Sequence, residues 1–285
     1  MIKKQPPLKP QLITADAPGV PPEFAVIETD DAYEAGTMAQ EAFEDPAVTL
    51  VVWSNAADLV PESLKQSVSA ISGLRDAKRH QARTEMVPGF WRAMFVEDDE
   101  DFLCGKQMKD HFNRIAVLTG HRDSILKEWR ENCCHITDDF MDAFGAKSLK
   151  LATRFQRNGG DHDGLHTDNF LRSDSIRIMR IVDGDTTLYY RSEDVERVME
   201  RQSYSRAYFR EAVELKENAQ AWAVRPWDFS FVSRNVAHQV PSSACGYDAE
   251  KRRIVEMYDI LSRHEFVAGA QRSLLKMLRG KPDLY

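Results

Sequence analysis

Three features that would direct the interpretation of this sequence are missing from it. Its 285 residues carry a net charge of −7 at pH 7, so no overall basic field favours nucleic acid or an anionic membrane surface as a partner. No window approaches the apolar length of a membrane span, and the first residues lack the apolar core and cleavage site of a secretory signal. We therefore expect a cytoplasmic protein whose partners include neither nucleic acid nor a membrane.

The cysteines also lack the spacing of a metal site or a disulfide framework. None of the four belongs to a CxxC pair, and the vicinal Cys133 and Cys134 cannot easily bridge or ligate one ion together. Cys104 and Cys245 lie far from both in the sequence. The pattern indicates buried or incidental thiols and argues against a zinc knuckle.

Prolines are concentrated at the start of the chain. Residues 1–25 contain six of the 12 prolines, which fix φ and remove amide donors. We expect these residues to form an arm that is extended or disordered. Residues 26–285 show no internal repeat and no long linker, and 42% of the whole chain is hydrophobic. They are predicted to form a single domain with a sizeable core.

The segment 54–146 has mainly helical spacing and is predicted to support the rest of the domain. After Pro61, which suits the first turn of a helix, apolar residues recur at three- and four-residue steps, at Leu64, Val68, Ile71 and Leu74. A second helical stretch covers 112–118 and resumes at 125–129. Thr137 can cap a third helix.

Strand-like segments dominate residues 147–260. Runs of β-branched, aromatic and alternating residues predict strands at 149–155, 176–182, 186–190, 221–224, 229–233 and 253–260, and "VTLVVW" at 48–53 predicts a buried strand before them. The sequence Asp183-Gly184-Asp185 predicts a tight turn between two neighbouring strands. The expected fold is therefore of the α+β class, with helices packed around a β core.

Two further helices are expected around this core. Residues 194–218 return to helical spacing among many charges, which suits an amphipathic helix packed on the core or, alternatively, a lid over its opening. An amphipathic helix at 262–280 is predicted to close the chain.

The stretch "GLHTDNF" carries the clearest chemical signal. His166 and Asp168 are two positions apart, so their side chains share one face of an extended segment. An iron(II) oxygenase site needs two neutral imidazoles and one carboxylate, with positions left open for O2 and an organic cosubstrate. His238 follows the predicted strand at 229–233 and can supply the second imidazole. A solvated polar turn is the alternative, and His162 or Asp163 would replace the two ligands if the register differs.

Two arginines at the start of the last strand are candidates for binding an anionic cosubstrate. A guanidinium inside a β core is costly unless it meets a carboxylate, and a dicarboxylate would supply a bidentate partner. We favour Arg253 over Arg252, because alternation places Arg253 with Val255 and Met257 but Arg252 with Glu256.

This order of motifs resembles that of the iron(II)- and 2-oxoglutarate-dependent dioxygenases over roughly residues 149–260. Within this superfamily the chain is similar to an uncharacterised bacterial domain family with an HxD, His and Arg pattern, whose "vnlavW"-like strand is here "VTLVVW" and whose "cprfHvD"-like segment is here "DGLHTD". The glycine usual in the turn before the histidine strand is replaced by Trp227-Asp228, and the interval from His238 to the arginine is long.

The resemblance implies a double-stranded β-helix, a jelly roll of the cupin type, with Fe(II) held by His166, Asp168 and His238. It also implies 2-oxoglutarate as cosubstrate, held by Arg253 or Arg252, and O2 as oxidant. The expected activity is hydroxylation of an unactivated C–H bond of a small molecule or an amino-acid-like substrate. Hydroxylation is favoured over halogenation because Asp168 occupies the position that chloride would need. A non-catalytic zinc- or iron-binding protein on the same barrel is the alternative. The sequence leaves open the primary substrate and whether the chain forms a homodimer.

Overall fold

The computed structural model describes only part of the chain, and everything said below about structure refers to that part. It covers residues 10–69, 82–87, 90–96, 112, 115, 124–146, 149–157, 165–170, 176–184, 186–203, 208–232, 236–239 and 252–260. The predicted helix at 262–280 lies outside these ranges, as do Ile71, Leu74, Asp163 and His162. No helix in the described ranges has both the length and the apolar character needed to cross a membrane.

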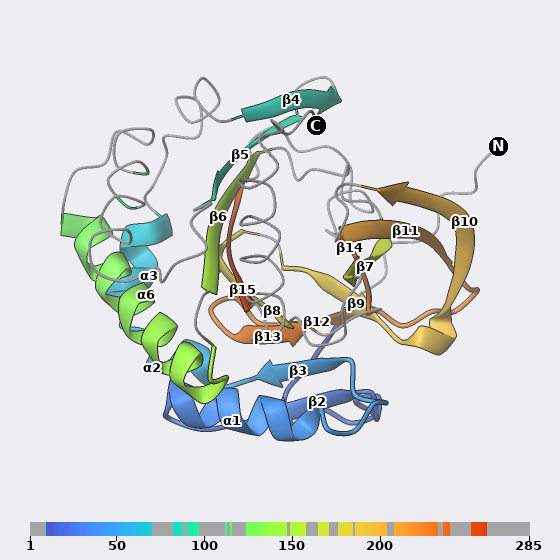
Figure 1. The fold of residues 1–285 in the computed structure, drawn as a ribbon, viewed down its shortest axis with the longest axis horizontal. Coiled ribbons are helices and arrows are strands. Elements are labelled where there is room, and N and C mark those ends of the chain that lie inside the picture. The colour runs from blue at the N-terminus through green and yellow to red at the C-terminus, as the bar shows by residue number, and fades with distance from the viewer. Residues whose placement is uncertain are drawn as a thin grey trace, which may run out of the picture.

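Two sheets form the body of the molecule (Figure 1). The larger has the order β2-β3-β13-β8-β15-β6-β5-β4 and the smaller the order β1-β12-β9-β14-β7-β11-β10. The strands of the larger sheet are β2 (Phe24–Ile27), β3 (Leu50–Trp53), β4 (Ala82–Val87), β5 (Phe90–Val96), β6 (Leu149–Arg157), β8 (Ile176–Asp183), β13 (Phe229–Val232) and β15 (Arg252–Ile260). Those of the smaller are β1 (Gln11–Leu12), β7 (His166–Phe170), β9 (Leu188–Tyr190), β10 (Val195–Ser203), β11 (Tyr208–Leu215), β12 (Trp222–Ala223) and β14 (Ala237–Gln239).

The chain changes sheet at nearly every turn of the β core. Strands β6, β8, β13 and β15 belong to the larger sheet, and β7, β9, β12 and β14 to the smaller. Their spatial orders, β6-β15-β8-β13 and β12-β9-β14-β7, are those of a double-stranded β-helix, the jelly roll that was predicted. One expectation about this core is wrong. The turn at Asp183-Gly184 does not join neighbouring strands, because β8 and β9 lie in different sheets. Gly184 has φ +85°, a backbone conformation that favours glycine.

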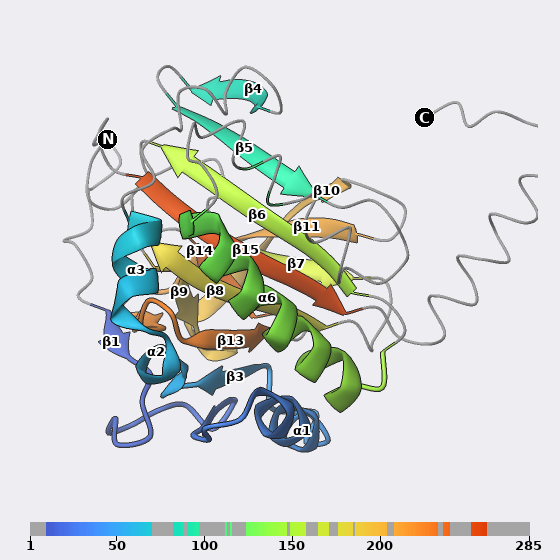
Figure 2. The same ribbon diagram turned by 90° about the vertical axis from the view of Figure 1, so that its left-hand side faces the viewer.

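Two apolar layers hold the sheets and helices together. One lies between the two sheets and includes Met179, Ile181, Tyr189, Val255 and Met257. The other lies between the larger sheet and the helices α1 (Ala32–Ala42), α2 (Ala56–Leu59), α3 (Glu62–Ser69) and α6 (Ser124–Ala143). These helices cover one face of the larger sheet, with α6 crossing its strands (Figure 2). The expected buried strand at 48–53 is confirmed, since every residue of β3 is buried.

Helix α6 corrects the prediction of two separate helices in this region. The structure has one continuous helix over Ser124–Ala143, and Thr137 lies inside it rather than at its start. Trp129, Cys133 and Phe140 are fully buried on the face that meets the sheet. Their spacing of four and seven residues is that of one helix face, so tertiary packing carries the helix through the capping residue.

The segment 194–218 is not the helix that its spacing predicted. After a 3-10 turn at Ser192–Asp194, it forms the antiparallel strands β10 and β11. β11 pairs in turn with β7, a segment about forty residues earlier in the sequence. Local apolar spacing is a weak prior, and this long-range pairing overrides it. The hairpin extends the smaller sheet beyond β7.

The segment 54–146 is also less helical than predicted. It contributes β4 and β5, which continue the larger sheet beyond β6. Pro88-Gly89, followed by the aromatic and apolar segment 90–96, is a turn–strand signal that could have indicated this hairpin. At the other end of the chain, β1 pairs in parallel with β12 and Ile13 is fully buried, so part of the 1–25 segment adds a strand to the smaller sheet.

A polar cluster is buried beneath α6, on the helix-covered face of the larger sheet. Arg180 on β8 and Glu256 on β15 are both fully buried, and the guanidinium Nε and Nη2 each lie 2.7 Å from the carboxylate Oε2. Trp129 and Cys133 on α6, together with Tyr258 on β15, donate further hydrogen bonds to this carboxylate. Burial raises the pKa of the Cys133 thiol and of the Tyr258 hydroxyl well above their usual values, so both remain protonated donors.

Helices α1 and α6 approach so closely at Gly36 that we expect Gly36→Ala to destabilise the protein. A Cβ at this position would lie 2.6 Å from Cβ of Ala143 and 3.3 Å from the ring of Phe144. Overpacking typically costs about 1–3 kcal/mol, which outweighs the gain of about 1 kcal/mol in helix propensity. Urea unfolding followed by circular dichroism measures the difference. Glu41→Ala, at an exposed position of α1, should change stability little, and a Gly36→Ala protein as stable as wild type would contradict the close contact.

Candidate functional site

Two buried histidines face each other across neighbouring strands of the smaller sheet. His166 is the first residue of β7 and lies directly opposite His238 of the antiparallel strand β14. Their ring centroids are 4.4 Å apart with an interplanar angle of 55°. The two residues are 6% and 8% exposed. The structure thus brings together two imidazoles that are 72 residues apart in the sequence.

Both imidazoles lie on the inner face of the barrel. His238 is also directly opposite Tyr189 of β9, with ring centroids 6.1 Å apart. Tyr189 belongs to the apolar layer between the sheets. Directly opposed residues of an antiparallel pair share a face, so His238 and His166 share the face of Tyr189.

The hydrogen bonding of His238 suits a metal ligand. Its Nδ1 lies 3.0 Å from the carbonyl oxygen of Val236, an acceptor that requires the proton to be on Nδ1. The lone pair is then on Nε2. A backbone carbonyl that fixes the tautomer in this way is a frequent partner of metal-binding imidazoles. Two neutral imidazoles at this separation fit one transition-metal ion.

The third predicted ligand, Asp168, is described only by its backbone. It lies two residues after His166 on β7, in register with Arg210 of β11. Strand alternation places it on the same face as His166. Because its side chain lies outside the described residues, its role as the carboxylate ligand stays a prediction. In the described ranges alone, no three His, Cys, Asp or Glu side chains are grouped closely enough to hold a metal ion.

Arg253 lies inside the barrel, near the opposite end of the histidine face. It is 4% exposed, and its Nη2 donates a hydrogen bond to the hydroxyl of Thr187, which precedes β9. This contact joins the larger sheet to the smaller. Val255 and Met257, two and four residues further along β15, belong to the layer between the sheets. The side chain of Arg252 lies outside the described residues.

Three polar residues near this site were missed by the sequence reasoning. Thr187 contacts Arg253 as above, and Tyr189, two residues later, lies directly opposite His238. The Tyr189 hydroxyl is 2.9 Å from Oγ of Ser230, which donates to the carbonyl of Met179 at 3.3 Å. The alternation of Thr187 and Tyr189 in "TTLYY" was a signal for one polar face, but nothing local indicated which face is inside.

Arg180 on β8 is a buried arginine that does not face the histidines. Ile178 and Val182, its mates by alternation, belong to the layer beneath the helices, while Met179 and Ile181 face the smaller sheet. Arg180 therefore lies on the face away from the histidines, where it pairs with Glu256.

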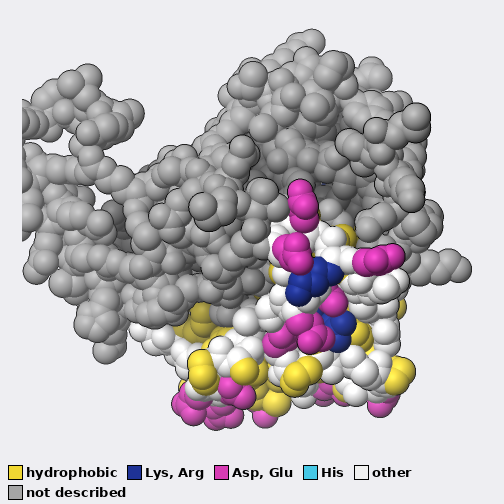
Figure 3. All heavy atoms as spheres, turned by 90° about the vertical axis from the view of Figure 1, so that its right-hand side faces the viewer, with side chains coloured by type: hydrophobic (Ala, Val, Ile, Leu, Met, Phe, Trp, Pro, Cys, Tyr) yellow, Lys and Arg dark blue, Asp and Glu magenta, His cyan; other side chains and the backbone are white. Residues whose placement is uncertain are grey.

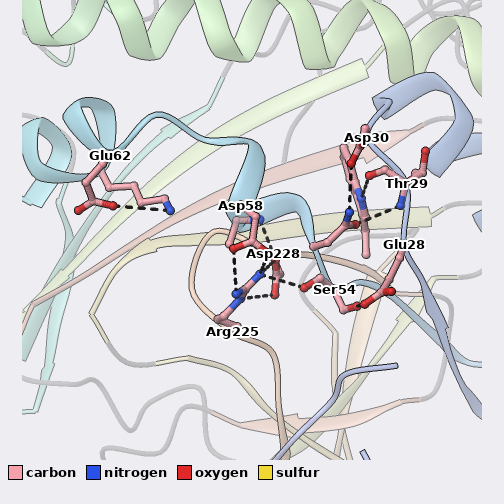
Figure 4. A network of polar contacts seen from close by, with 12 residues as sticks. Glu28, Thr29, Asp30, Ser54, Asp58, Glu62, Arg225 and Asp228 are labelled. Atoms are coloured by element: carbon pink, nitrogen blue, oxygen red, sulfur yellow. Dashed lines mark hydrogen bonds and ion pairs between the residues drawn. The ribbon is translucent and has the colours of Figure 1, made fainter. Parts of the chain in front are cut away.

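The turn before β13 has the backbone conformation of a glycine turn without a glycine. Trp227 has φ +72°, in the left-handed region. The next residue, Asp228, is 1% exposed and accepts hydrogen bonds from the amide of Ala57 at 2.8 Å and from Nε of Arg225 at 3.0 Å. Arg225 also pairs with Asp58 (Figure 4). Burial raises the pKa of Asp228 to about 6, although Arg225 acts in the other direction. Asp228 thus ties α2 to the turn.

Charges of both signs are interspersed on the face of the molecule shown in Figure 3. Within the described part of this face, Lys and Arg side chains lie among Asp and Glu side chains. Among the described residues, Arg191 pairs with Glu193 at 2.6 Å and with Asp194 at 2.8 Å. The expectation that nucleic acid is not a partner stays a prediction.

Comparison with known proteins gives likeness in structure only. No protein-family model matches the sequence, and no curated protein does. Similar solved structures include the dioxygenase for auxin oxidation of rice, 11% identical over 84% of this chain and 83% of that one, with a TM-score of 0.44. The 2-oxoglutarate complex of dioxygenase for auxin oxidation 1 from Arabidopsis thaliana is 10% identical over 85% of this chain and 94% of that one, with a TM-score of 0.45. A prolyl-4-hydroxylase from Pseudomonas putida is 9% identical over 75% and 93%, with a TM-score of 0.36.

These structures are of two dioxygenases and a hydroxylase, and at 9–11% identity the likeness concerns the fold alone. The fold assignment therefore rests on the strand order of the chain itself. The chemistry has to be argued from the site.

Proposed function

We propose that this protein is an iron(II)- and 2-oxoglutarate-dependent oxygenase that hydroxylates an unactivated C–H bond of a small molecule. The observation that carries the proposal is the pairing of His166 and His238 inside a double-stranded β-helix whose interior also contains the guanidinium of Arg253. A metal store needs the imidazoles but has no use for a buried cation in the same interior. An enzyme that binds a dicarboxylate beside its metal needs both.

His166, Asp168 and His238 would hold the iron. Two imidazoles and one carboxylate on one side of the ion leave the opposite positions open. Iron bound there would couple oxidative decarboxylation of 2-oxoglutarate by O2 to substrate hydroxylation, so that one oxygen atom enters succinate, the other enters the C–H bond, and CO2 is released. The carboxylate of Asp168 favours hydroxylation over halogenation, because chloride would need its position.

Arg253 and Thr187 would bind the distal carboxylate of 2-oxoglutarate. A guanidinium pairs with a carboxylate through two parallel hydrogen bonds, and the Thr187 hydroxyl beside it can donate a third. Thr187 lies two residues before Tyr189, which stands directly opposite His238, so these groups lie one strand repeat from the histidines. The side chains of the inter-sheet layer exclude water around this path, which strengthens each charged contact.

Release of succinate tests the proposal directly. The protein is reconstituted anaerobically with Fe(II), mixed with 2-oxoglutarate and then exposed to O2, and succinate is measured with and without candidate small-molecule substrates. An oxygenase of this type forms succinate at least slowly without its substrate. Stoichiometric metal binding with no succinate under any of these conditions would instead support the non-catalytic metal-binding alternative.

We expect Arg253→Ala to raise the apparent dissociation constant of 2-oxoglutarate by more than tenfold. Truncating one partner of a buried charged pair costs about 3–5 kcal/mol, and about 1.4 kcal/mol already corresponds to tenfold. Iron affinity should stay near wild type, because Arg253 donates to Thr187 and is not one of the proposed metal ligands. The measurement is an anaerobic titration of the iron-to-ligand charge-transfer absorbance.

Arg252→Ala is the matched control for this experiment. Its place on β15 puts it on the other face of the strand, so its effect should be small. A strong effect of Arg252→Ala with none of Arg253→Ala would assign the cosubstrate to the neighbouring arginine. No effect of either would show that 2-oxoglutarate is not held at this end of the barrel.

A further inference from the structure

We propose that Arg210, on the β10–β11 hairpin, binds a carboxylate group of the primary substrate. The hairpin extends the smaller sheet beyond β7, the strand that carries His166 and Asp168. This inference rests on the proposed oxygenase function and names a substrate class for it, a small carboxylic acid with an apolar body.

The register of the hairpin places Arg210 beside the predicted metal site. Ala212 is directly opposite His166, and Arg210 is directly opposite Asp168. Opposed residues of an antiparallel pair share a face and have Cα atoms about 4.5–5.5 Å apart. Arg210 therefore occupies a position on the inner face of the smaller sheet, beside the position of Asp168, the predicted carboxylate ligand.

Arg210 lies on the far side of the site from Arg253. Tyr189, His238 and His166 stand side by side on three neighbouring strands and form one row across the smaller sheet. Thr187 lies two residues before this row on the chain leading into β9, and Asp168 lies two residues after it on β7. These two positions are four residues apart along the strand direction, or about 13 Å at about 3.3 Å per residue. The distal carboxylate of one 2-oxoglutarate cannot occupy both. An anion at Arg210 is consequently not the carboxylate that Arg253 holds.

The next row on the same face is aromatic. Tyr208 of β11 is directly opposite Phe170 of β7, one strand repeat beyond Arg210 and Asp168. The arginine position at 210 would meet a carboxylate at one end of a molecule, and the aromatic positions at 208 and 170 would meet an apolar body. On this arrangement the substrate enters beside Asp168 while 2-oxoglutarate extends toward Arg253.

The competing interpretation is a cross-strand ion pair in which Arg210 only supports Asp168. The two interpretations differ in what Arg210→Gln changes. If Arg210 only orients Asp168, Arg210→Gln should lower the affinity for iron. If Arg210 binds the substrate, the same change should lower the affinity for an organic acid and leave the affinity for iron unchanged. Arg201 provides a matched control, because it is in register with Glu211, whose row alternates to the other face of the hairpin.

The experiment uses the full chain loaded anaerobically with Fe(II) and 2-oxoglutarate, and loading is verified first from the charge-transfer absorbance. Phenylacetate and its uncharged analogue phenylacetamide are then titrated by calorimetry. We expect phenylacetate to bind wild type at least tenfold more tightly than the amide. Arg210→Gln should abolish this difference, Arg210→Lys should restore part of it, and Arg201→Gln should behave as wild type.

Each contrary result has a distinct meaning. If wild type takes up no iron or no 2-oxoglutarate, the proposed function fails at the loading step and this inference fails with it. If loading succeeds but wild type does not prefer the acid over the amide, only the inference is overturned. It is also overturned if Arg210→Gln lowers iron content while phenylacetate affinity is unchanged, since Arg210 would then serve Asp168.

Discussion

Replacing either His166 or His238 with alanine should remove stoichiometric iron binding while leaving the circular dichroism spectrum largely intact. The two imidazoles are opposed at 4.4 Å between ring centroids, so each variant leaves a single imidazole at the site. Changes to outer partners of a metal site already weaken binding by about 10–100-fold, and loss of a direct ligand costs more. The measurement is iron content after anaerobic reconstitution and desalting.

His135→Ala is the control for these variants. Its side chain is 79% exposed on α6, where it pairs with Asp139. This helix belongs to neither sheet, so His135 is not part of the strands that carry the candidate site. It should bind iron as wild type does. Wild-type iron content in His166→Ala or His238→Ala would mean that the paired imidazoles are not the metal ligands.

Replacing Glu256 with leucine should cause the largest loss of stability, about 3–5 kcal/mol, because it leaves a buried guanidinium without its carboxylate. Arg180 is fully buried and lies 4.8 Å from the ring of Phe229 and 5.2 Å from that of Trp227. These aromatic faces attract the cation but do not replace an ion pair. Urea unfolding at neutral pH, followed by circular dichroism, measures the loss.

The double variant Arg180→Met with Glu256→Leu separates charge from packing. Replacing both partners of a buried pair by apolar residues of similar volume is often close to neutral, so the double variant should recover most of the loss. Glu193→Ala removes a partly exposed ion pair with Arg191 and should cost at most about 1 kcal/mol. A Glu256→Leu protein within about 1 kcal/mol of wild type would show that the buried pair contributes little.

The fold was predictable where local pattern and burial agree. Strand β3 is an uninterrupted apolar run and is buried along its whole length, and β15 alternates as its sequence suggests. The hairpin of β10 and β11 was not predictable in the same way. Its charges and apolar residues fit a helix as well as a strand, and its state is decided by pairing with β7, a contact that no local window contains.

The candidate site shows the same division. His166 and His238 could be proposed because each lies at a strand boundary next to a chemically suggestive neighbour. Thr187 could not, because its relevance comes from a hydrogen bond to Arg253 across the two sheets, over 66 residues of sequence. The role of Asp228 was hidden for the same reason, since the amide that it accepts from belongs to Ala57, 171 residues earlier.

The place of β15 in the larger sheet has a consequence for the synthesis of the protein. This strand lies between β8 and β6, so among the strands that the structure describes in this sheet, an inner one is translated last. Until residues 252–260 have emerged from the ribosome, β6 and β8 each keep a row of backbone donors and acceptors that no partner satisfies. Before that point a nascent chain carries two open sheet edges, for which other nascent chains compete, and β6 and β8 are joined only after residues 252–260 have been translated.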